Sequence, residues 1–151
     1  MKILVIGLGS MGKRRLRNLK ALKEEDILAF DLREDRRKEV EEKYRIKTFA
    51  NFEEAMKEKP EVFIISVPPD IHLKYQLYAA KHDIHFFTEA SVVKDGLEEV
   101  IELLKQKDIV GVPSSTLRFH PAIKKIKELV DNNKIGRLCT FTYHSGQYLP
   151  D

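Results

Sequence analysis

The chain has 151 residues, of which 42% are hydrophobic and 34% charged, with a net charge of +3. This composition excludes a disordered chain and a membrane protein, and the length allows one domain with little room for a second. Acidic and basic residues are interspersed, so we expect no nucleic-acid partner and no membrane surface. Cys139 is the single cysteine, which excludes an internal disulfide, and no signal peptide is recognised, so we expect a cytoplasmic protein.

Short apolar runs alternate with segments of helical spacing along most of the chain. The runs that predict strands are 2–6, 26–30, 47–49, 62–67, 84–87 and 109–112. We expect Asn51, Asp70 and Asp95 to begin helices between them. Strict alternation of strands and helices predicts an α/β fold with a doubly wound parallel sheet, the Rossmann arrangement, over residues 1–118.

Residues 119–151 do not continue this alternation. A helix is expected over 121–130, and Leu138–His144 then has strand character, with Cys139, Phe141 and Tyr143 on one face. No second strand follows it, so these residues are expected to begin an incomplete second α/β domain. A lone strand has open backbone groups, which favours a homo-oligomer paired through Leu138–His144 over a disordered tail.

A glycine-rich turn, Gly7-Leu8-Gly9-Ser10-Met11-Gly12, follows the first expected strand and opens a helix. In this context the pattern predicts a dinucleotide site, with Ser10 and Met11 as candidate cofactor-binding residues beside the glycines. Gly7 permits the tight turn, Gly9 lets the backbone approach a pyrophosphate, and Gly12 lets helix and strand pack closely. The alternative is a turn that only connects a strand to a helix.

Asp31 ends the second expected strand, 19 residues after Gly12. A carboxylate at this position accepts a hydrogen bond from a ribose 2′-hydroxyl and repels a 2′-phosphate, which favours NAD over NADP. Three nearby arginines leave NADP open, although the favoured interpretation is a solvated helix face; they are Arg33, Arg36 and Arg37, expected to pair with Glu34, Glu39 and Glu41. Three cations of the first helical turn either reach a phosphate or point into solvent; they are Lys13, Arg14 and Arg15.

Three further segments resemble the glucose–fructose oxidoreductase/inositol dehydrogenase (Gfo/Idh/MocA) family. They are Ser66-Val67-Pro68-Pro69 with His72, then Phe86-Phe87-Thr88-Glu89, and Arg118-Phe119-His120-Pro121. The resemblance implies an NAD(P)-dependent oxidoreductase acting on a sugar or polyol. It also implies that Val67, Pro68 and His72 line the cofactor, that Glu89 lies near the nicotinamide ribose, and that Arg118 faces the cleft. Each residue also has a plainer alternative. Pro68-Pro69 would only stop the strand, and His72 would be solvated. Glu89 would pair with a surface lysine, and Arg118 would cap a carbonyl.

The sequence departs from the family pattern where the family has Glu-Lys-Pro, because it reads Glu89-Ala90-Ser91. The family's lysine is the usual polar partner of the substrate hydroxyl, and alanine can neither donate nor accept a proton, so the catalytic residue is unknown. The sugar-like substrate is expected to bind through a missing domain. Residues 146–151 resemble members associated with cell-surface sugar biosynthesis.

The competing hypotheses are a stand-alone dinucleotide-binding sensor or accessory module without activity and, more distantly, an adenosine-nucleotide or coenzyme A binder. The histidines have no metal-ligand spacing.

Overall fold

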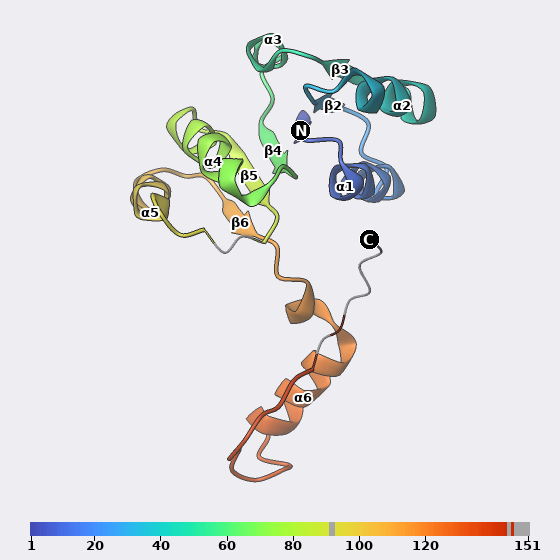
Figure 1. Ribbon diagram of the computed structural model, residues 1–151. Helices are drawn as coiled ribbons and strands as arrows, with labels where there is room; N and C mark the ends of the chain where they lie inside the picture. Colours follow the sequence, from blue (N-terminus) through green and yellow to red (C-terminus); the bar gives the residue numbers. More distant parts are fainter. Residues whose placement is uncertain (91–92, 145, 147–151) are drawn as a thin grey trace. The chain divides into compact units, whose positions relative to one another are not determined.

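The computed structural model describes residues 1–90, 93–144 and 146. The chain divides into two compact units, Met1–Ser114 and Ser115–Asp151, against an expected boundary after residue 118. The first unit holds the alternating strands and helices (Figure 1). None of the described helices combines the length and the apolar character that crossing a bilayer requires.

The first unit is built on a single parallel sheet. Its strands are β1 (Ile3–Ile6), β2 (Ile27–Phe30), β3 (Lys47–Phe49), β4 (Val62–Ile65), β5 (His85–Thr88) and β6 (Gly111–Pro113). Every neighbouring pair is parallel, in the order β3-β2-β1-β4-β5-β6. The order reverses between β1 and β4, so the predicted doubly wound sheet is confirmed.

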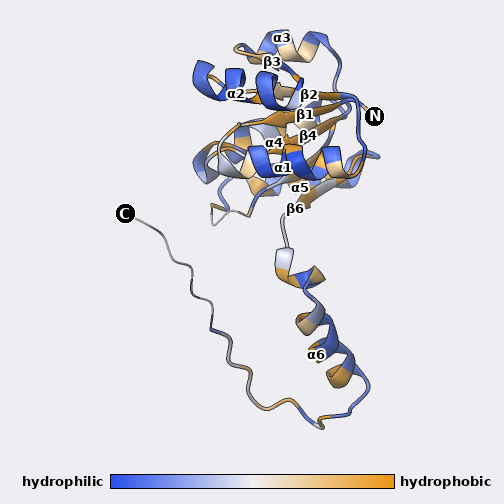
Figure 2. Ribbon diagram, turned by 90° about the vertical axis from the view of Figure 1, so that its right-hand side faces the viewer, coloured by the Kyte–Doolittle hydropathy of each residue, from blue (hydrophilic) through white to orange (hydrophobic). Residues whose placement is uncertain are grey.

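Helices cover both faces of this sheet. They are α1 (Ser10–Ala21), α2 (Glu34–Tyr44), α3 (Phe52–Lys57), α4 (His72–Lys81) and α5 (Leu97–Gln106). Val5 packs with Leu16 and Val40 of α1 and α2, whereas Leu4 and Ile6 pack on the other face with residues of α3, α4 and α5. Alternate residues of β1 therefore enter two separate cores, which is why its sequence is apolar throughout. Figure 2 shows the hydrophobic strands between helices that are hydrophilic outside.

One of the three predicted helix starts is confirmed. The Asn51 side chain accepts a hydrogen bond from the Glu54 N–H at 3.2 Å and caps α3. The prediction for Asp70 is wrong, because Pro69 begins a 3-10 turn over Pro69–Ile71 and α4 starts only at His72. The prediction for Asp95 is also wrong: α5 begins at Leu97, after Gly96 with a φ of +82°.

The second unit contains a 3-10 turn, Thr116–Phe119, and α6, Pro121–Asp131. Leu138–His144 form no strand in the described part of the chain, and their assignment as the first strand of an incomplete second domain stays a prediction. A strand needs a neighbour that accepts and donates its backbone hydrogen bonds, and the described segments of this unit supply none. Pairing of this segment between two copies stays a prediction.

Candidate functional site

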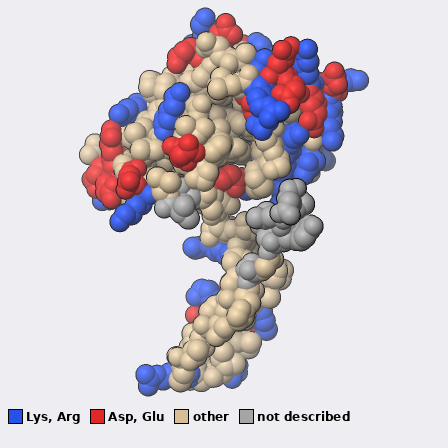
Figure 3. Space-filling model, viewed as in Figure 1, with Lys and Arg blue, Asp and Glu red and all other residues tan. Residues whose placement is uncertain are grey.

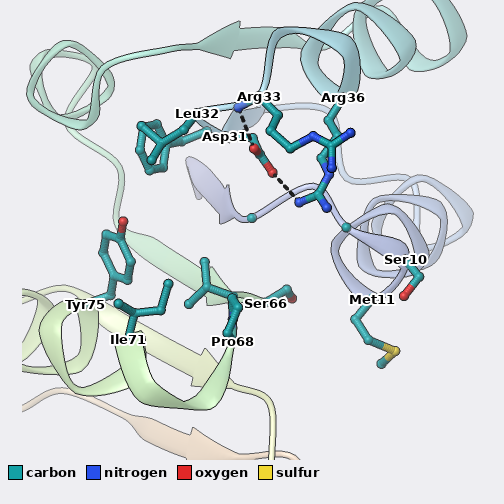
Figure 4. A pocket seen from close by; sticks show the side chains of 14 residues that line it. Ser10, Met11, Asp31, Leu32, Arg33, Arg36, Ser66, Pro68, Ile71 and Tyr75 are labelled. Atoms are coloured by element: carbon teal, nitrogen blue, oxygen red, sulfur yellow. Dashed lines mark hydrogen bonds and ion pairs between the residues drawn. The ribbon is translucent and has the colours of Figure 1, made fainter.

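A cavity of about 490 Å³ opens at the carboxyl ends of β1, β2 and β4 (Figure 4). The strands are in register, with Ile6 opposite both Phe30 and Ile65, so the residues that follow them meet at one edge of the sheet. This edge, where the strand order reverses, is where doubly wound sheets bind ligands. The lining residues are Gly7, Gly9, Ser10, Met11, Phe30, Asp31, Leu32, Arg33, Arg36, Ser66, Val67, Pro68, Ile71 and Tyr75.

The three glycines of the turn differ in what requires them. Gly7 has a φ of +88°, and a Cβ there would lie 2.7 Å from the Ser66 carbonyl oxygen. A Cβ on Gly12 would lie 1.8 Å from the Gly7 carbonyl oxygen. At Gly9, by contrast, Arg36 Nη1 at 3.8 Å is the one atom of the described residues, chain neighbours aside, within 4 Å of such a Cβ. The fold therefore requires Gly7 and Gly12, whereas the space above Gly9 is open to a ligand.

The N-terminus of α1 faces this open space with uncapped backbone N–H groups. Gly9 is the N-cap and brings no side chain, and the first turn holds no acidic residue. The first N–H groups of a helix have no intrahelical acceptor and attract anions. Two of the three cations in this turn have carboxylate partners, since Lys13 Nζ donates to Glu39 at 2.7 Å and Arg15 pairs with Glu89, whereas Arg14 is exposed. An anion beside this turn would therefore meet the first backbone N–H groups of α1.

Asp31 is fixed in the cavity wall by two backbone donors. Its Oδ2 accepts the Leu8 N–H at 2.7 Å, and its Oδ1 accepts the Arg33 N–H at 2.8 Å. The side chain is only 7% exposed. A carboxylate oxygen can accept two hydrogen bonds, so Asp31 can still accept a hydrogen bond from a ligand hydroxyl.

The expected pairing of the three arginines is wrong. Arg33 pairs with Asp35 at 2.6 Å, Arg37 donates to the carbonyl oxygens of Asp31 and Leu32, and Arg36 turns toward the Asp31 carboxylate at 3.4 Å. The reason is that α2 begins at Glu34, which places its first turn beside the end of β2. The three glutamates take other partners: Lys38, Lys13 and Thr48. Charges of both signs are mixed over α2 (Figure 3).

Tyr75 also lines the cavity, and the sequence analysis did not single it out. It is 7% exposed and packs edge-to-face against Phe30 and Phe52. Burial, and then the charge of Asp31, raise the pKa of its phenol, so the hydroxyl stays protonated as a donor. The sequence has a tyrosine on the buried side of the helix that follows Pro68-Pro69. This pattern does not distinguish an aromatic ring of the core from a residue of the site.

His72 does not line this cavity. It is 2% exposed, and its Nε2 donates to the Val67 carbonyl oxygen at 2.7 Å. The solvated alternative is therefore wrong, and a contact between His72 and the cofactor stays a prediction. By this bond His72 holds the turn that carries Val67 and Pro68, both of which do line the cavity. His72 is thus a positioning residue for the wall, and it adjoins a separate, mainly apolar cavity of about 250 Å³ between α4 and α5.

Glu89 also lies outside the cavity and forms a bidentate ion pair with Arg15. Arg15 Nε and Nη2 donate to its two carboxylate oxygens at 2.6 and 2.9 Å, and the guanidinium lies over the Phe87 ring. The expected alternative of a surface lysine is wrong. The pair ties α1 to the end of β5, next to the exposed Ala90.

The other expectations from the family resemblance also stay predictions. Arg118 is exposed in the second unit, and its role at a cleft stays a prediction. Ser91 and most of the segment 146–151 lie outside the described residues. Among the described residues, no three of the His, Cys, Asp and Glu side chains are grouped to hold a metal ion.

Comparison with known proteins decides the family. The model of an oxidoreductase family with an NAD-binding Rossmann fold matches residues 1–115. The chain belongs to the Gfo/Idh/MocA family. The resemblance carried by the sequence motifs is thereby confirmed, and the cavity belongs to an NAD(P)-binding domain.

Relatives of this Gfo/Idh/MocA domain are longer. Myo-inositol 2-dehydrogenase of Thermotoga maritima is 32% identical over 142 residues, which is 91% of this chain and 42% of that protein. The crystal structure of a probable dehydrogenase from Thermotoga maritima matches with a TM-score of 0.80 at 29% identity, covering 90% of this chain and 42% of that one. The WlbA dehydrogenase from Bordetella pertussis, solved with NADH and UDP-GlcNAcA, has a TM-score of 0.80 at 10% identity over 91% of this chain and 44% of that one, which shows the shared fold. The chain thus spans less than half the length of these relatives.

Proposed function

We propose that this chain is the cofactor-binding part of an NAD(P)-dependent dehydrogenase that oxidises a sugar or polyol, with NAD(H) preferred. The observation that carries the proposal is the pairing of open space above Gly9 with the fixed carboxylate of Asp31 in one cavity. The likeness to a myo-inositol 2-dehydrogenase supports a polyol or sugar substrate. Bound nicotinamide supplies the acceptor for the hydride.

The chain's own residues would bind and orient the cofactor. The backbone over Gly9, Ser10 and Met11 would take the pyrophosphate, because the uncapped start of α1 faces the cavity there. Gly7 and Gly12 would keep the turn tight enough for that approach. Asp31 would accept the adenosine ribose hydroxyls, and Val67 with Pro68 would form the opposite wall.

Fluorescence titration with NADH and NADPH tests this proposal. We expect NADH to bind more tightly, because the buried carboxylate of Asp31 accepts a hydroxyl and repels a phosphate. A clear preference for NADPH would contradict the role given to Asp31, and failure of both to bind would overturn the proposal.

A dinucleotide-binding module without catalytic activity is the second candidate. It is favoured by Ala90, which stands where the family has its lysine. Formation of NADH from NAD⁺ and myo-inositol, measured on the longest chain that contains this sequence, separates the two. Turnover supports the dehydrogenase, and NADH binding without turnover of any sugar or polyol supports the module.

His72→Ala should weaken both the fold and NADH binding. The substitution removes the bond to the Val67 carbonyl and leaves a hole in a site that is 2% exposed, so we expect a loss of about 2 kcal/mol in the free energy of unfolding. NADH affinity should fall because the wall around Val67 is no longer held. His82→Ala, at the exposed end of α4, is the matched control. Equal stability and affinity in the two variants would contradict the positioning role.

A further inference from the structure

A second cavity, of about 250 Å³, lies between α4 and α5. The two helices are neighbours on one face of the sheet (Figure 1), and the described lining residues all belong to the first unit. Among the described residues, none lines both this cavity and the candidate cofactor cavity. It is therefore a separate space, to which cofactor binding gives no role.

Apolar side chains form most of the wall of this cavity. They come from α4, β5 and α5 and include Leu73, Phe86, Val100 and Leu104, of which Phe86 and Val100 are buried. A cavity of about 150 Å³ with walls of this kind stays free of water and binds benzene. The cavity between α4 and α5 thus has room for a benzene ring with small substituents.

Three polar side chains interrupt this apolar wall. His72, Gln76 and Thr88 line the cavity, and they are 2%, 5% and 4% exposed. His72 and Gln76 are one helical turn apart and share a face of α4. Thr88 follows Phe86 by two positions and shares its face of β5. The polar groups therefore come from two elements that meet at this cavity.

These polar side chains lack hydrogen-bond partners. Within the described part of the chain, Thr88 Oγ1 and His72 Nδ1 have none, and nothing hydrogen-bonds to the Gln76 amide. His72 Nε2 already donates to the Val67 carbonyl oxygen, so Nδ1 of the neutral ring can only accept. Buried polar groups are almost always paired, and each exception requires an explanation. A ligand hydroxyl, which donates and accepts at once, would give these groups their partner.

The charges around the cavity exclude an ionised ligand. Glu89 and Asp95 also line it, and its described lining residues include no lysine or arginine, so an anion would be repelled. A cation would leave water for an apolar wall, where Glu89 is already paired with Arg15. The ligand that fits this cavity is therefore uncharged.

We propose that the cavity between α4 and α5 is a second ligand site, which binds a small uncharged phenol. The ring packs among the apolar side chains and edge-to-face with Phe86, a contact that an aliphatic alcohol does not make. The hydroxyl accepts a hydrogen bond from Thr88 and donates one to the amide oxygen of Gln76 or to His72 Nδ1. This inference goes beyond the proposed function and stands without it, because it uses no residue of the cofactor cavity.

Titration with p-cresol, toluene and 4-methylbenzoate, followed through the backbone amide signals of the chain by nuclear magnetic resonance, tests the proposal. The first two probes differ only in the hydroxyl, and the third carries a carboxylate in its place. We expect p-cresol to bind at least about tenfold more tightly than toluene, with signal changes concentrated in α4 and α5. 4-Methylbenzoate should leave these signals unchanged.

Two substitutions remove polar groups from the wall while keeping a similar side-chain volume. Gln76→Leu and Thr88→Val should each weaken p-cresol binding by about threefold or more and should not weaken toluene binding. Thr48→Val is the matched control, because it removes a threonine hydroxyl from β3 at the far edge of the sheet, and it should change neither affinity. Thermal unfolding of each variant establishes that the fold is retained.

Several results would overturn the proposal. One is the absence of binding by both p-cresol and toluene, and another is equal affinity for the two. Tighter binding of 4-methylbenzoate would contradict the uncharged ligand, and signal changes centred on Gly9 and Asp31 would place the probe in the cofactor cavity instead. Unchanged p-cresol affinity in both variants would show that the hydroxyl binds elsewhere. NADH binding is measured separately, so failure of this proposal leaves the cofactor proposal standing.

Discussion

Gly9→Val should abolish NADH binding while leaving the fold intact. The only atom of the described residues, chain neighbours aside, within 4 Å of a Cβ at this position is Arg36 Nη1, the end of a flexible side chain, so the folded chain has room for the substitution. A pyrophosphate above the turn would meet the new methyl groups and lose its contacts with the start of α1. Losing two charge-assisted hydrogen bonds costs about 3 kcal/mol, or roughly a hundredfold in affinity.

Fluorescence titration with NADH measures the loss, and thermal unfolding measures the stability. The matched control is Arg14→Ala, which changes an exposed side chain of the same helix and should leave NADH affinity within about twofold. Retention of full NADH affinity by Gly9→Val would place the pyrophosphate elsewhere. A large drop in the unfolding temperature would mean that Gly9 serves the fold rather than the ligand.

Gly12→Ala should have the opposite outcome and destabilise the fold itself. The added Cβ would lie 1.8 Å from the carbonyl oxygen of Gly7, a backbone atom that cannot rotate away. Gly7 is held in turn by its N–H, which donates to the Phe30 carbonyl oxygen at 2.8 Å. We expect a loss of about 3 kcal/mol or more in the free energy of unfolding, because overpacking against backbone forces the helix off the sheet.

In a chain of this size such a loss lowers the unfolding temperature by about 10 °C. Circular dichroism during heating measures it. Gly136→Ala is a useful comparison, since no atom of the described residues lies within 4 Å of its Cβ position and the strain there comes only from a φ of +69°. A Gly12→Ala variant as stable as the unaltered chain would show that α1 and β1 are not as closely packed as the structure has them.

The sequence by itself was enough for the elements whose pattern is local or repeated. The apolar runs of β1, β2 and β4 have no polar face, which only a sheet covered on both sides allows, so the fold class followed directly. Asp31 was identified by its distance from the glycine turn, because the βαβ unit between them has a nearly constant length. The structural roles of Gly7 and Gly12 also followed, since the backbone at these two places in the turn leaves no room for a side chain, whereas the role of Gly9 toward a pyrophosphate stays a prediction.

Only the tertiary structure decided which side chains meet across that backbone. Arg15 and Glu89 are 74 positions apart, and they pair because α1 passes the end of β5. His72 is buried and donates to the Val67 carbonyl oxygen, a contact that the sequence does not indicate, and its implied place at the cofactor stays a prediction. The strand expected over Leu138–His144 stays a prediction, because a strand depends on a partner segment, and a residue pattern specifies the tendency to form a strand but not the partner. Arg36 faces the Asp31 carboxylate, whereas Arg33 pairs with Asp35 and Arg37 donates to the Asp31 carbonyl oxygen. Which arginine contacts which acceptor depends on distances that the sequence does not contain.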